Sequence, residues 1–210
     1  MNTDHEKITS TINFYHKSAD ELITRYESAD MSVLHRTIVD HLDEGSKLLD
    51  IGFGSGRDLA FLRENGFDIW GADPSEKFVE HAQKRFPDIS NHFFCTALPN
   101  LVLPSDLERS FDAIILIAVW MHLPQNTYED AIRSLCSFLK PGGTLILSYS
   151  ITQRDEKSER YFENVDRELL QNLFKKHNCH LTATHTNSDG LSARDIIWVT
   201  EVYTYRKELS

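Results

Sequence analysis

Three alternating glycines follow an apolar run in the segment "LLDIGFGSGRDLAF", residues 48–61. Gly52, Gly54 and Gly56 let the backbone pass close to a ligand, and the exposed N–H groups that open the next helix favour an anionic group. Asp73 lies 21 residues after Gly52, where an acidic side chain at a strand end accepts hydrogen bonds from ribose hydroxyls. The turn and the acid together predict a site for an adenosine-containing ligand.

The spacing of the glycines separates the classes of nucleotide ligand. A dinucleotide fingerprint, G-x-G-x-x-G, would place its third glycine at position 57, which is Arg57 in this chain. A triphosphate loop would need Lys-Ser or Lys-Thr after the glycines, and neither pair follows them. The pattern therefore argues against a dinucleotide and against a nucleoside triphosphate.

Short apolar runs alternate with amphipathic stretches from Lys47 onward, which is typical of a parallel sheet covered by helices. The predicted strands span residues 47–51, 68–72, 92–95, 111–117 and 143–148, and the predicted helices span residues 57–65, 75–86, 128–139 and 166–177. Two further strands, 179–186 and 194–205, are joined by the turn-rich "NSDGLSA" and predict an antiparallel hairpin at one edge. We therefore expect an α/β fold with a mostly parallel sheet, helices on both faces and a terminal hairpin.

The first 45 residues have a different character from the rest. They contain "FYHKSADELITRYESAD", whose polar and aromatic residues predict a helical cap over the edge of the sheet. The chain has 210 residues, without an internal repeat, a low-complexity tract or a linker. We expect a single domain over residues 1–210, with the cap at 1–45 and the core at 46–210.

Charge and composition narrow the partners. Lys and Arg number 22 against 32 Asp and Glu, which gives a net charge of −10 and argues against a nucleic-acid partner. The start, "MNTDHEKITS", has no apolar signal segment, and no apolar run approaches the length of a membrane span, so we expect a cytoplasmic protein without a membrane association. Cys95, Cys136 and Cys179 are far apart in the sequence, which predicts reduced, mostly buried thiols.

Four segments occur in order between residues 47 and 148: "LLDIGFGSGRD", "GADPS", "FDAIILIAVWMHLP" and "LKPGGTLILS". Together they resemble the motifs of class I S-adenosylmethionine-dependent methyltransferases. The resemblance implies a Rossmann-like seven-stranded sheet whose last strand is antiparallel, with S-adenosylmethionine as cofactor and S-adenosylhomocysteine as product. The cofactor-binding residues that it implies are Asp50, Gly52, Gly54 and Gly56 around the methionine part, Asp73 on the ribose, Pro74 beside it, and Thr96, Ala97, Leu98 and Ala118.

The segment after the third strand departs from the family pattern. In this family it usually carries an acid that contacts the adenine amine, followed by "LP". Here the segment reads "CTALPNL", so that Thr96 takes the place of the acid. Main-chain groups of Ala97 and Leu98 are the alternative contacts for the adenine.

Methyl transfer is an in-line displacement, for which the enzyme mainly aligns the nucleophile and excludes water. A base helps when the nucleophile begins protonated. His122 in "AVWMHLP" is the candidate base, because residues just after the fourth strand line the methyl-transfer pocket in this family; the alternative is a hydrogen-bonded structural histidine. Trp120 either walls the methyl site or belongs to the core.

The resemblance also makes the N-terminal cap a lid over cofactor and substrate, with Tyr15, Arg25 and Tyr26 as substrate contacts. Tyr15 and Tyr26 are three helical turns apart and fit one helix face. The alternative is a cap that simply packs on the sheet. The segment 151–166 holds Tyr161 and Phe162 and is either a mobile substrate gate, with Tyr161 as a substrate contact, or a solvated charged face.

A metal site is not expected. The candidate ligands near the C-terminus are His177, Cys179, His180 and His185. Strand alternation points Cys179 and His185 to one face of the sheet and His180 to the other, which scatters the ligands.

The acceptor is narrowed by missing patterns. The chain has no "NPPY"-like or "DPPY"-like tetrapeptide after the fourth strand, no Pro-Cys pair of a cytosine-C5 enzyme and no paired glutamates of a protein arginine methyltransferase. A short, acidic chain then favours a small-molecule acceptor. Two alternatives stay open: an RNA or protein methyltransferase with a docking strip, and a non-catalytic S-adenosylmethionine sensor. The residues of that strip would be Arg154, Lys157, Arg160 and Arg167.

Overall fold

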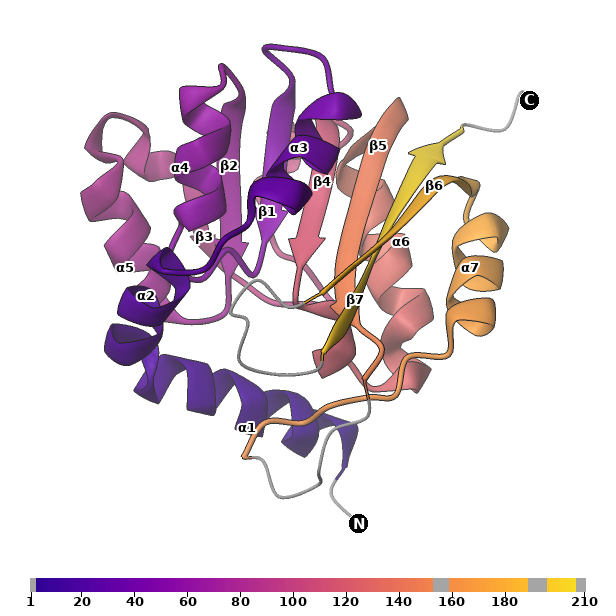
Figure 1. The fold of residues 1–210 in the computed structure, drawn as a ribbon, viewed down its shortest axis with the longest axis horizontal. Helices are drawn as coiled ribbons and strands as arrows, with labels where there is room; N and C mark the ends of the chain where they lie inside the picture. Colours follow the sequence, from indigo (N-terminus) through magenta and orange to yellow (C-terminus); the bar gives the residue numbers. More distant parts are fainter. Residues whose placement is uncertain (1–2, 153–158, 189–195, 207–210) are drawn as a thin grey trace.

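A single seven-stranded sheet forms the centre of the computed structural model (Figure 1), which describes residues 3–152, 159–188 and 196–206. The strand order is β3-β2-β1-β4-β5-β7-β6. All paired strands run parallel except β7, which is antiparallel to both β5 and β6. The strands are β1 (Lys47–Ile51), β2 (Asp68–Asp73), β3 (Phe93–Cys95), β4 (Phe111–Ile117), β5 (Leu139–Ser150), β6 (Cys179–Ser188) and β7 (Ile197–Tyr205). The predicted α/β, Rossmann-like fold with its terminal hairpin is confirmed.

Helices cover both faces of the sheet, as the two hydrophobic clusters show. Side chains alternate along each strand, so Leu49 and Ile114 pack in the cluster with α6 and α7, and Leu48 and Ile115 pack in the cluster with α3, α4 and α5. The helices are α1 (Asp4–Lys17), α2 (Ala19–Glu27), α3 (Ser32–Asp40), α4 (Arg57–Glu64), α5 (Glu76–Arg85), α6 (Tyr128–Phe138) and α7 (Arg167–Lys176). Short 3₁₀ turns, η1 to η4, span Pro87–His92, Ser105–Leu107, Trp120–His122 and Gln125–Thr127.

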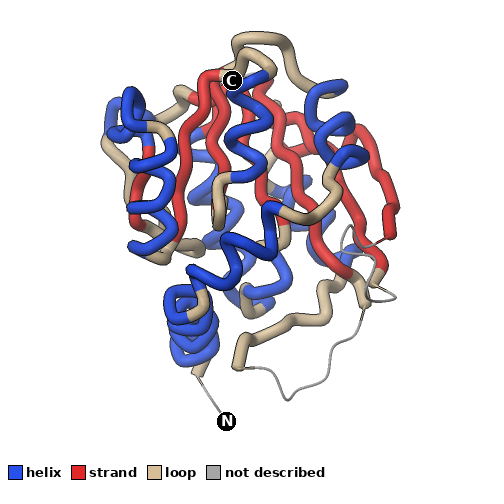
Figure 2. Tube along the Cα trace, turned by 60° about the vertical axis from the view of Figure 1, so that its left-hand side comes forward, coloured by secondary structure: helices blue, strands red, loops and turns tan. Residues whose placement is uncertain are grey.

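The helices α1 and α2 lie below the carboxyl ends of the parallel strands (Figure 1), and the turned view shows them at the same end of the sheet (Figure 2). The cap is broken at Ser18, where α1 ends and α2 begins. Tyr15 and Tyr26 therefore lie on two helices, and the prediction that they share one helix face is wrong. The helix α3 packs against α4 instead, where the His35 ring stacks on Phe61 at 3.9 Å between centroids.

The start of β5 differs from the expectation by four residues. The strand β5 begins at Leu139, directly after α6, because Leu139 already pairs with Phe111; the register shifts before Ala113 pairs with Thr144. The predicted start at 143 took "PGG" as a separate turn. Residues 194 and 195, the expected beginning of the last strand, lie outside the described residues.

The three cysteines differ in their exposure to solvent. Cys179 is buried and Cys136 is half-buried, but Cys95 is exposed at the end of an edge strand, which corrects the expectation for that thiol. Among the described residues, no helix combines the length and the apolar character needed to cross a membrane.

Candidate active site

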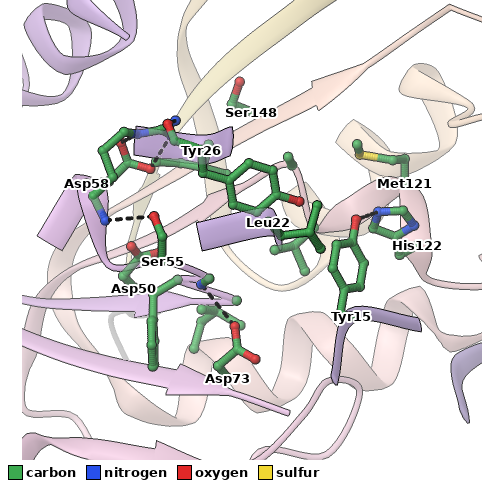
Figure 3. A pocket seen from close by; sticks show the side chains of 18 of the residues that line it. Tyr15, Leu22, Tyr26, Asp50, Ser55, Asp58, Asp73, Met121, His122 and Ser148 are labelled. Atoms are coloured by element: carbon green, nitrogen blue, oxygen red, sulfur yellow. Dashed lines mark hydrogen bonds and ion pairs between the residues drawn. The ribbon is translucent and has the colours of Figure 1, made fainter. Parts of the chain in front are cut away.

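A cavity of about 720 Å³ lies between the carboxyl ends of the strands and the cap helices. Figure 3 shows Asp50 and Asp73 on one side of it and the Tyr15–His122 pair on the other. Most of the predicted site residues line it: Asp50, Gly52, Gly54, Asp73, Pro74, Thr96, Ala97, Leu98, Ala118, His122, Tyr15, Arg25 and Tyr26. The sequence motifs are therefore brought to one place by the parallel arrangement of β1, β2, β3 and β4.

The glycine turn and the end of β2 are joined by hydrogen bonds. The Asp73 carboxylate accepts from the Gly54 amide at 3.0 Å and from the Ser75 amide at 2.8 Å. Gly52 has φ +72°, and a Cβ there would lie 2.5 Å from Cγ2 of Val119, so the turn requires glycine. Gly56 also has a positive φ, but it is the N-cap residue before α4 and does not line the cavity. Its role is the shape of the turn.

Buried carboxylates dominate this end of the cavity. Asp50 is 2% exposed, and among the described residues none gives its carboxylate a hydrogen bond or an ion pair. Burial raises the pKa of Asp50 well above its usual value, and the neighbouring charges of Asp58 and Asp73 raise it further. Burial also raises the pKa of Asp73 to about 6, against the two amide hydrogen bonds that lower it. The site therefore favours a cation and hydroxyl donors.

The sequence reasoning missed Asp58, on the first turn of α4. Its carboxylate accepts hydrogen bonds from His35 Nε2 at 2.7 Å and from Arg57 at 2.9 and 3.0 Å. Burial favours the neutral acid, but the hydrogen bonds from His35 and Arg57 outweigh it and hold the pKa of Asp58 below its usual value. Since Arg57 also donates to the carbonyl of Tyr26 at 2.8 Å, this group ties the glycine turn to the cap.

The opposite end of the cavity is built around His122, which is 8% exposed. Its Nδ1 lies 2.7 Å from the carbonyl oxygen of Tyr161, and its Nε2 lies 2.9 Å from the hydroxyl of Tyr15 (Figure 3). The ring centroid of Phe162 is 4.6 Å from that of His122. The sequence separation of Tyr15 and His122, 107 residues, explains why no local pattern could pair them.

A family described as "Methyltransferase domain" matches residues 23–188, which is most of the chain. The chain belongs to this methyltransferase family. With the Rossmann-like sheet and the glycine turn, this makes it a class I S-adenosylmethionine-dependent methyltransferase, as the sequence motifs predicted.

Relatives and solved structures agree with this assignment. An uncharacterized methyltransferase of Alkaliphilus oremlandii is 25% identical over 83% of this chain and 74% of its own length. A tRNA U34 carboxymethyltransferase of Idiomarina loihiensis is 30% identical over 59% of this chain, which spans only 41% of that relative. In structure, the 1,6-didemethyltoxoflavin-N1-methyltransferase of Burkholderia thailandensis has a TM-score of 0.79 at 16% identity, over 99% of this chain and 92% of that one. At that identity the likeness concerns the fold.

Trp120 of the methyltransferase does not line the cavity. It is fully buried, and its ring centroid lies 5.0 Å from that of Tyr128 and 5.5 Å from that of Phe174. Trp120 and His122 belong to a single 3₁₀ turn, in which successive side chains point about 120° apart. Met121 and His122 therefore face the cavity while Trp120 enters the core. Trp120 is thus a core residue and does not form a wall of the methyl site.

Tyr161 contributes its main chain rather than its side chain. The carbonyl holds His122, whereas the phenol donates to Glu163 at 2.6 Å and the ammonium of Lys7 lies 4.7 Å from the ring centroid. The side chain of Tyr161 is not part of the cavity lining. The phenol of Tyr161 is therefore not the expected substrate contact. The main-chain carbonyl of Tyr161 instead positions the His122 ring.

The basic residues of the expected docking strip have separate surroundings. Arg160 points into the cavity, where its Nη1 donates to the Tyr15 hydroxyl at 3.3 Å and its guanidinium covers the Phe14 and Phe162 rings. Arg167 is paired with the buried Glu201 at 2.9 Å. Residues 154 and 157 lie outside the described residues, as does most of the charged half of the expected gate.

The remaining cap residues differ in exposure. Arg25 is exposed at the rim of the cavity. Burial raises the pKa of Tyr26, and the nearby Tyr15 raises it further, so Tyr26 is a neutral hydrogen-bonding group.

In the described part of the chain, no group of three or more His, Cys, Asp or Glu residues is arranged to hold a metal ion.

Proposed function

We propose that this methyltransferase moves a methyl group from S-adenosylmethionine to a small-molecule acceptor that binds between the cap and the carboxyl ends of the strands. The observation that carries the proposal is the two-ended cavity, with buried carboxylates at one end and a hydrogen-bonded tyrosine–histidine pair at the other. A cavity of about 720 Å³ falls within the range of small-molecule sites.

The residues present fit the cofactor. Asp50 is a buried carboxylate facing the cavity and would bind the ammonium group of the methionine part, while Asp73 would accept from the ribose hydroxyls. Thr96, Ala97 and Leu98 line the place expected for adenine. The Thr96 hydroxyl accepts from the Val102 amide at 2.9 Å, and the main-chain groups of Ala97 and Leu98 are the proposed adenine contacts. When bound, the cofactor supplies a methyl group on a positively charged sulfur.

The acceptor end supports a small ring compound. The cavity is lined there by Tyr15 and Phe162, so an acceptor would be held by aromatic side chains and kept from water. The Tyr26 ring lies over the glycine turn, 3.5 Å from where a Cβ at Gly54 would be. The structural neighbour from Burkholderia thailandensis is described with bound 1,6-didemethyltoxoflavin, and its likeness extends over the cap of this chain.

Calorimetric titration tests the cofactor half of the proposal. Wild-type protein should bind S-adenosylmethionine and S-adenosylhomocysteine with micromolar dissociation constants and should not bind NAD, and Asp73→Ala should lose both sulfur ligands. Failure of the wild type to bind either sulfur ligand would contradict the proposal. A screen of small-molecule acceptors with S-adenosylmethionine follows on the binding-competent protein.

RNA is the competing acceptor, because one relative is named as a tRNA U34 carboxymethyltransferase. Against it stand the net charge of −10 and the engagement of Arg160 and Arg167 with groups of the chain itself. An RNA acceptor would bind tRNA with an affinity that falls steeply with salt. We expect weak binding of tRNA and no methyl transfer to it.

A further inference from the structure

The hydrogen bonds of His122 define which of its nitrogens carries the proton. A carbonyl oxygen only accepts, so Nδ1, at 2.7 Å from the Tyr161 oxygen, must be the donor. In the neutral imidazole Nε2 is then the acceptor, and the Tyr15 hydroxyl at 2.9 Å gives its only proton to it. The Tyr15 oxygen therefore takes part in all its other hydrogen bonds as an acceptor.

The surroundings of the Tyr15 oxygen favour a developing negative charge. Arg160 Nη1 donates to it at 3.3 Å, and the guanidinium lies 5.7 Å from the Tyr15 ring centroid. A phenol oxygen has two lone pairs. One accepts from Arg160, and for the other an O–H or N–H group of a bound molecule takes the place of the Tyr26 hydroxyl, which hydrogen-bonds to Tyr15. Tyr15 lines the cavity, so a bound molecule can reach this oxygen.

The side chains around Tyr15 and His122 favour a flat ligand. Phe162 packs on His122 with 4.6 Å between the centroids. Tyr26 lies near Tyr15, and the interaction with Tyr15 raises the pKa of Tyr26. Both rings line the cavity, and the Arg160 guanidinium lies 5.0 Å from the Phe162 centroid. Aromatic faces and a planar cation around one hydrogen-bond acceptor are suited to an aromatic ring that carries a proton donor.

We propose that Tyr15 is a catalytic residue and that the methyl acceptor is a planar aromatic or heteroaromatic molecule with a weakly acidic O–H or N–H group. The acceptor passes its proton to the Tyr15 oxygen while Tyr15 passes its own proton to Nε2 of His122. The electron pair left on the acceptor atom forms the bond to the methyl group. The sulfur–methyl bond breaks, and its electrons stay on sulfur as a neutral thioether.

The proton then rests on His122, whose imidazolium keeps the Nδ1 hydrogen bond to Tyr161 and returns the proton to water through Tyr15 after the product leaves. His122 thus acts through Tyr15, which refines its expected role as the base. The inference rests on the proposed function, since the transfer needs S-adenosylmethionine in the same cavity.

The experiment uses 4-nitrophenol as the acid probe and 4-nitroanisole as the same ring without the acidic proton. Both are titrated into the protein saturated with S-adenosylhomocysteine, and the colour of the nitrophenolate ion reports ionisation. We expect 4-nitrophenol to bind about tenfold more tightly than 4-nitroanisole, which corresponds to ~1.4 kcal/mol. We also expect the bound phenol to ionise at a pH lower by about one unit than the free phenol.

Tyr15→Phe should remove both effects, and Tyr205→Phe, at the far end of β7, is the matched control that should keep them. Equal binding of the two probes by the wild type, or an ionisation shift that survives in Tyr15→Phe, would overturn the role of Tyr15. Binding of neither probe would overturn the acceptor class. Calorimetry with S-adenosylhomocysteine on each sample separates these results from a failure of the proposed function, in which the wild type would not bind that ligand.

A second measurement does not depend on a variant that folds. Nitrogen NMR of the histidine rings in the wild type distinguishes the two neutral tautomers. A proton on Nδ1 of His122 agrees with the relay, and a proton on Nε2 overturns it, because Nε2 could not then accept from Tyr15.

Discussion

The main-chain amide of Gly54 donates a hydrogen bond of 3.0 Å to the carboxylate of Asp73. The two residues belong to the turn after β1 and to the end of β2, which pair in parallel with Ile51 opposite Ala72. Since parallel neighbours end at the same edge of a sheet, the turn and the acid meet without any long loop. This contact fixes the acid where the turn can share a ligand with it.

Asp73→Asn is expected to weaken S-adenosylmethionine binding about 10- to 100-fold, because hydrogen bonds to a charged acceptor contribute ~1.5–3 kcal/mol. The variant keeps the shape of the side chain but loses the charge. Calorimetry is the measurement, and Asp112→Asn is the control, since Asp112 pairs with Lys140 at 2.6 Å at the opposite end of the sheet. Unchanged affinity in Asp73→Asn would remove Asp73 from the cofactor site.

The affinity for S-adenosylmethionine should fall as the pH is lowered through 6. The pKa of Asp73 is raised to about 6 by burial, and the ligand prefers the ionised form, so binding below this pH requires that a proton be released. Once the pH is well below 6, affinity should drop about tenfold per unit, and above about 7 it should be flat with respect to this group. The raised pKa of Asp50 acts in the same direction.

Titrations in buffers of different ionisation heat check this prediction, because they count the protons released on binding. Asp73→Asn should release fewer protons at pH 6 than the wild type, and Asp112→Asn should release the same number. An affinity that rises toward low pH would contradict the assignment of the ammonium group to Asp50 and of the ribose hydroxyls to Asp73.

Gly52→Ala should damage both stability and cofactor binding, whereas Gly45→Ala should affect stability alone. Both glycines have positive φ, +72° and +80°, so each alanine costs ~1–2 kcal/mol of stability through the backbone. Only at Gly52 would the new Cβ meet a neighbour, Cγ2 of Val119 at 2.5 Å, which adds ~1–3 kcal/mol. Chemical denaturation and calorimetry measure the two effects.

The double variant Gly52→Ala/Val119→Ala isolates the clash. It removes the Val119 neighbour but leaves the backbone strain. It should therefore recover the ~1–3 kcal/mol of stability lost to the clash, and not the ~1–2 kcal/mol lost to the positive φ. A double variant no more stable than Gly52→Ala would mean that the clash contributes nothing.

The sheet was predictable because its signals are local. The run "FDAIILI" is buried on both faces, and β4 lies between β1 and β5 as such a run requires. The glycine turn and Asp73 were predictable for the same reason, since the turn chemistry and the strand end are each written in a few adjacent residues. The family motifs then supplied the cofactor.

The acceptor end was less predictable because its contacts join distant segments. The pairing of Tyr15 with His122 and the position of Arg160 depend on how the cap meets the sheet, and a charged run with an arginine reads equally well as a solvated face. Ser18 interrupts a sequence that has no proline or glycine to mark a break. The direction of Trp120 depends on a 3₁₀ turn that hydrophobic periodicity does not resolve.

The reassignment of Trp120 to the core leads to the last prediction. Trp120→Phe should lower the free energy of unfolding by about 1–3 kcal/mol, because it leaves unfilled space between Tyr128 and Phe174. It should leave the affinity for S-adenosylhomocysteine within about twofold, less than ~0.5 kcal/mol, since the indole is not in the cavity wall. Met121→Leu is the comparison for stability, because Met121 belongs to the same turn but lines the cavity. A swap of similar volume there should lower the free energy of unfolding by less than ~1.5 kcal/mol. If Trp120→Phe kept full stability and instead changed which acceptors bind, the indole would belong to the methyl site after all, and the 3₁₀ turn would have to present all three of its side chains to the ligand.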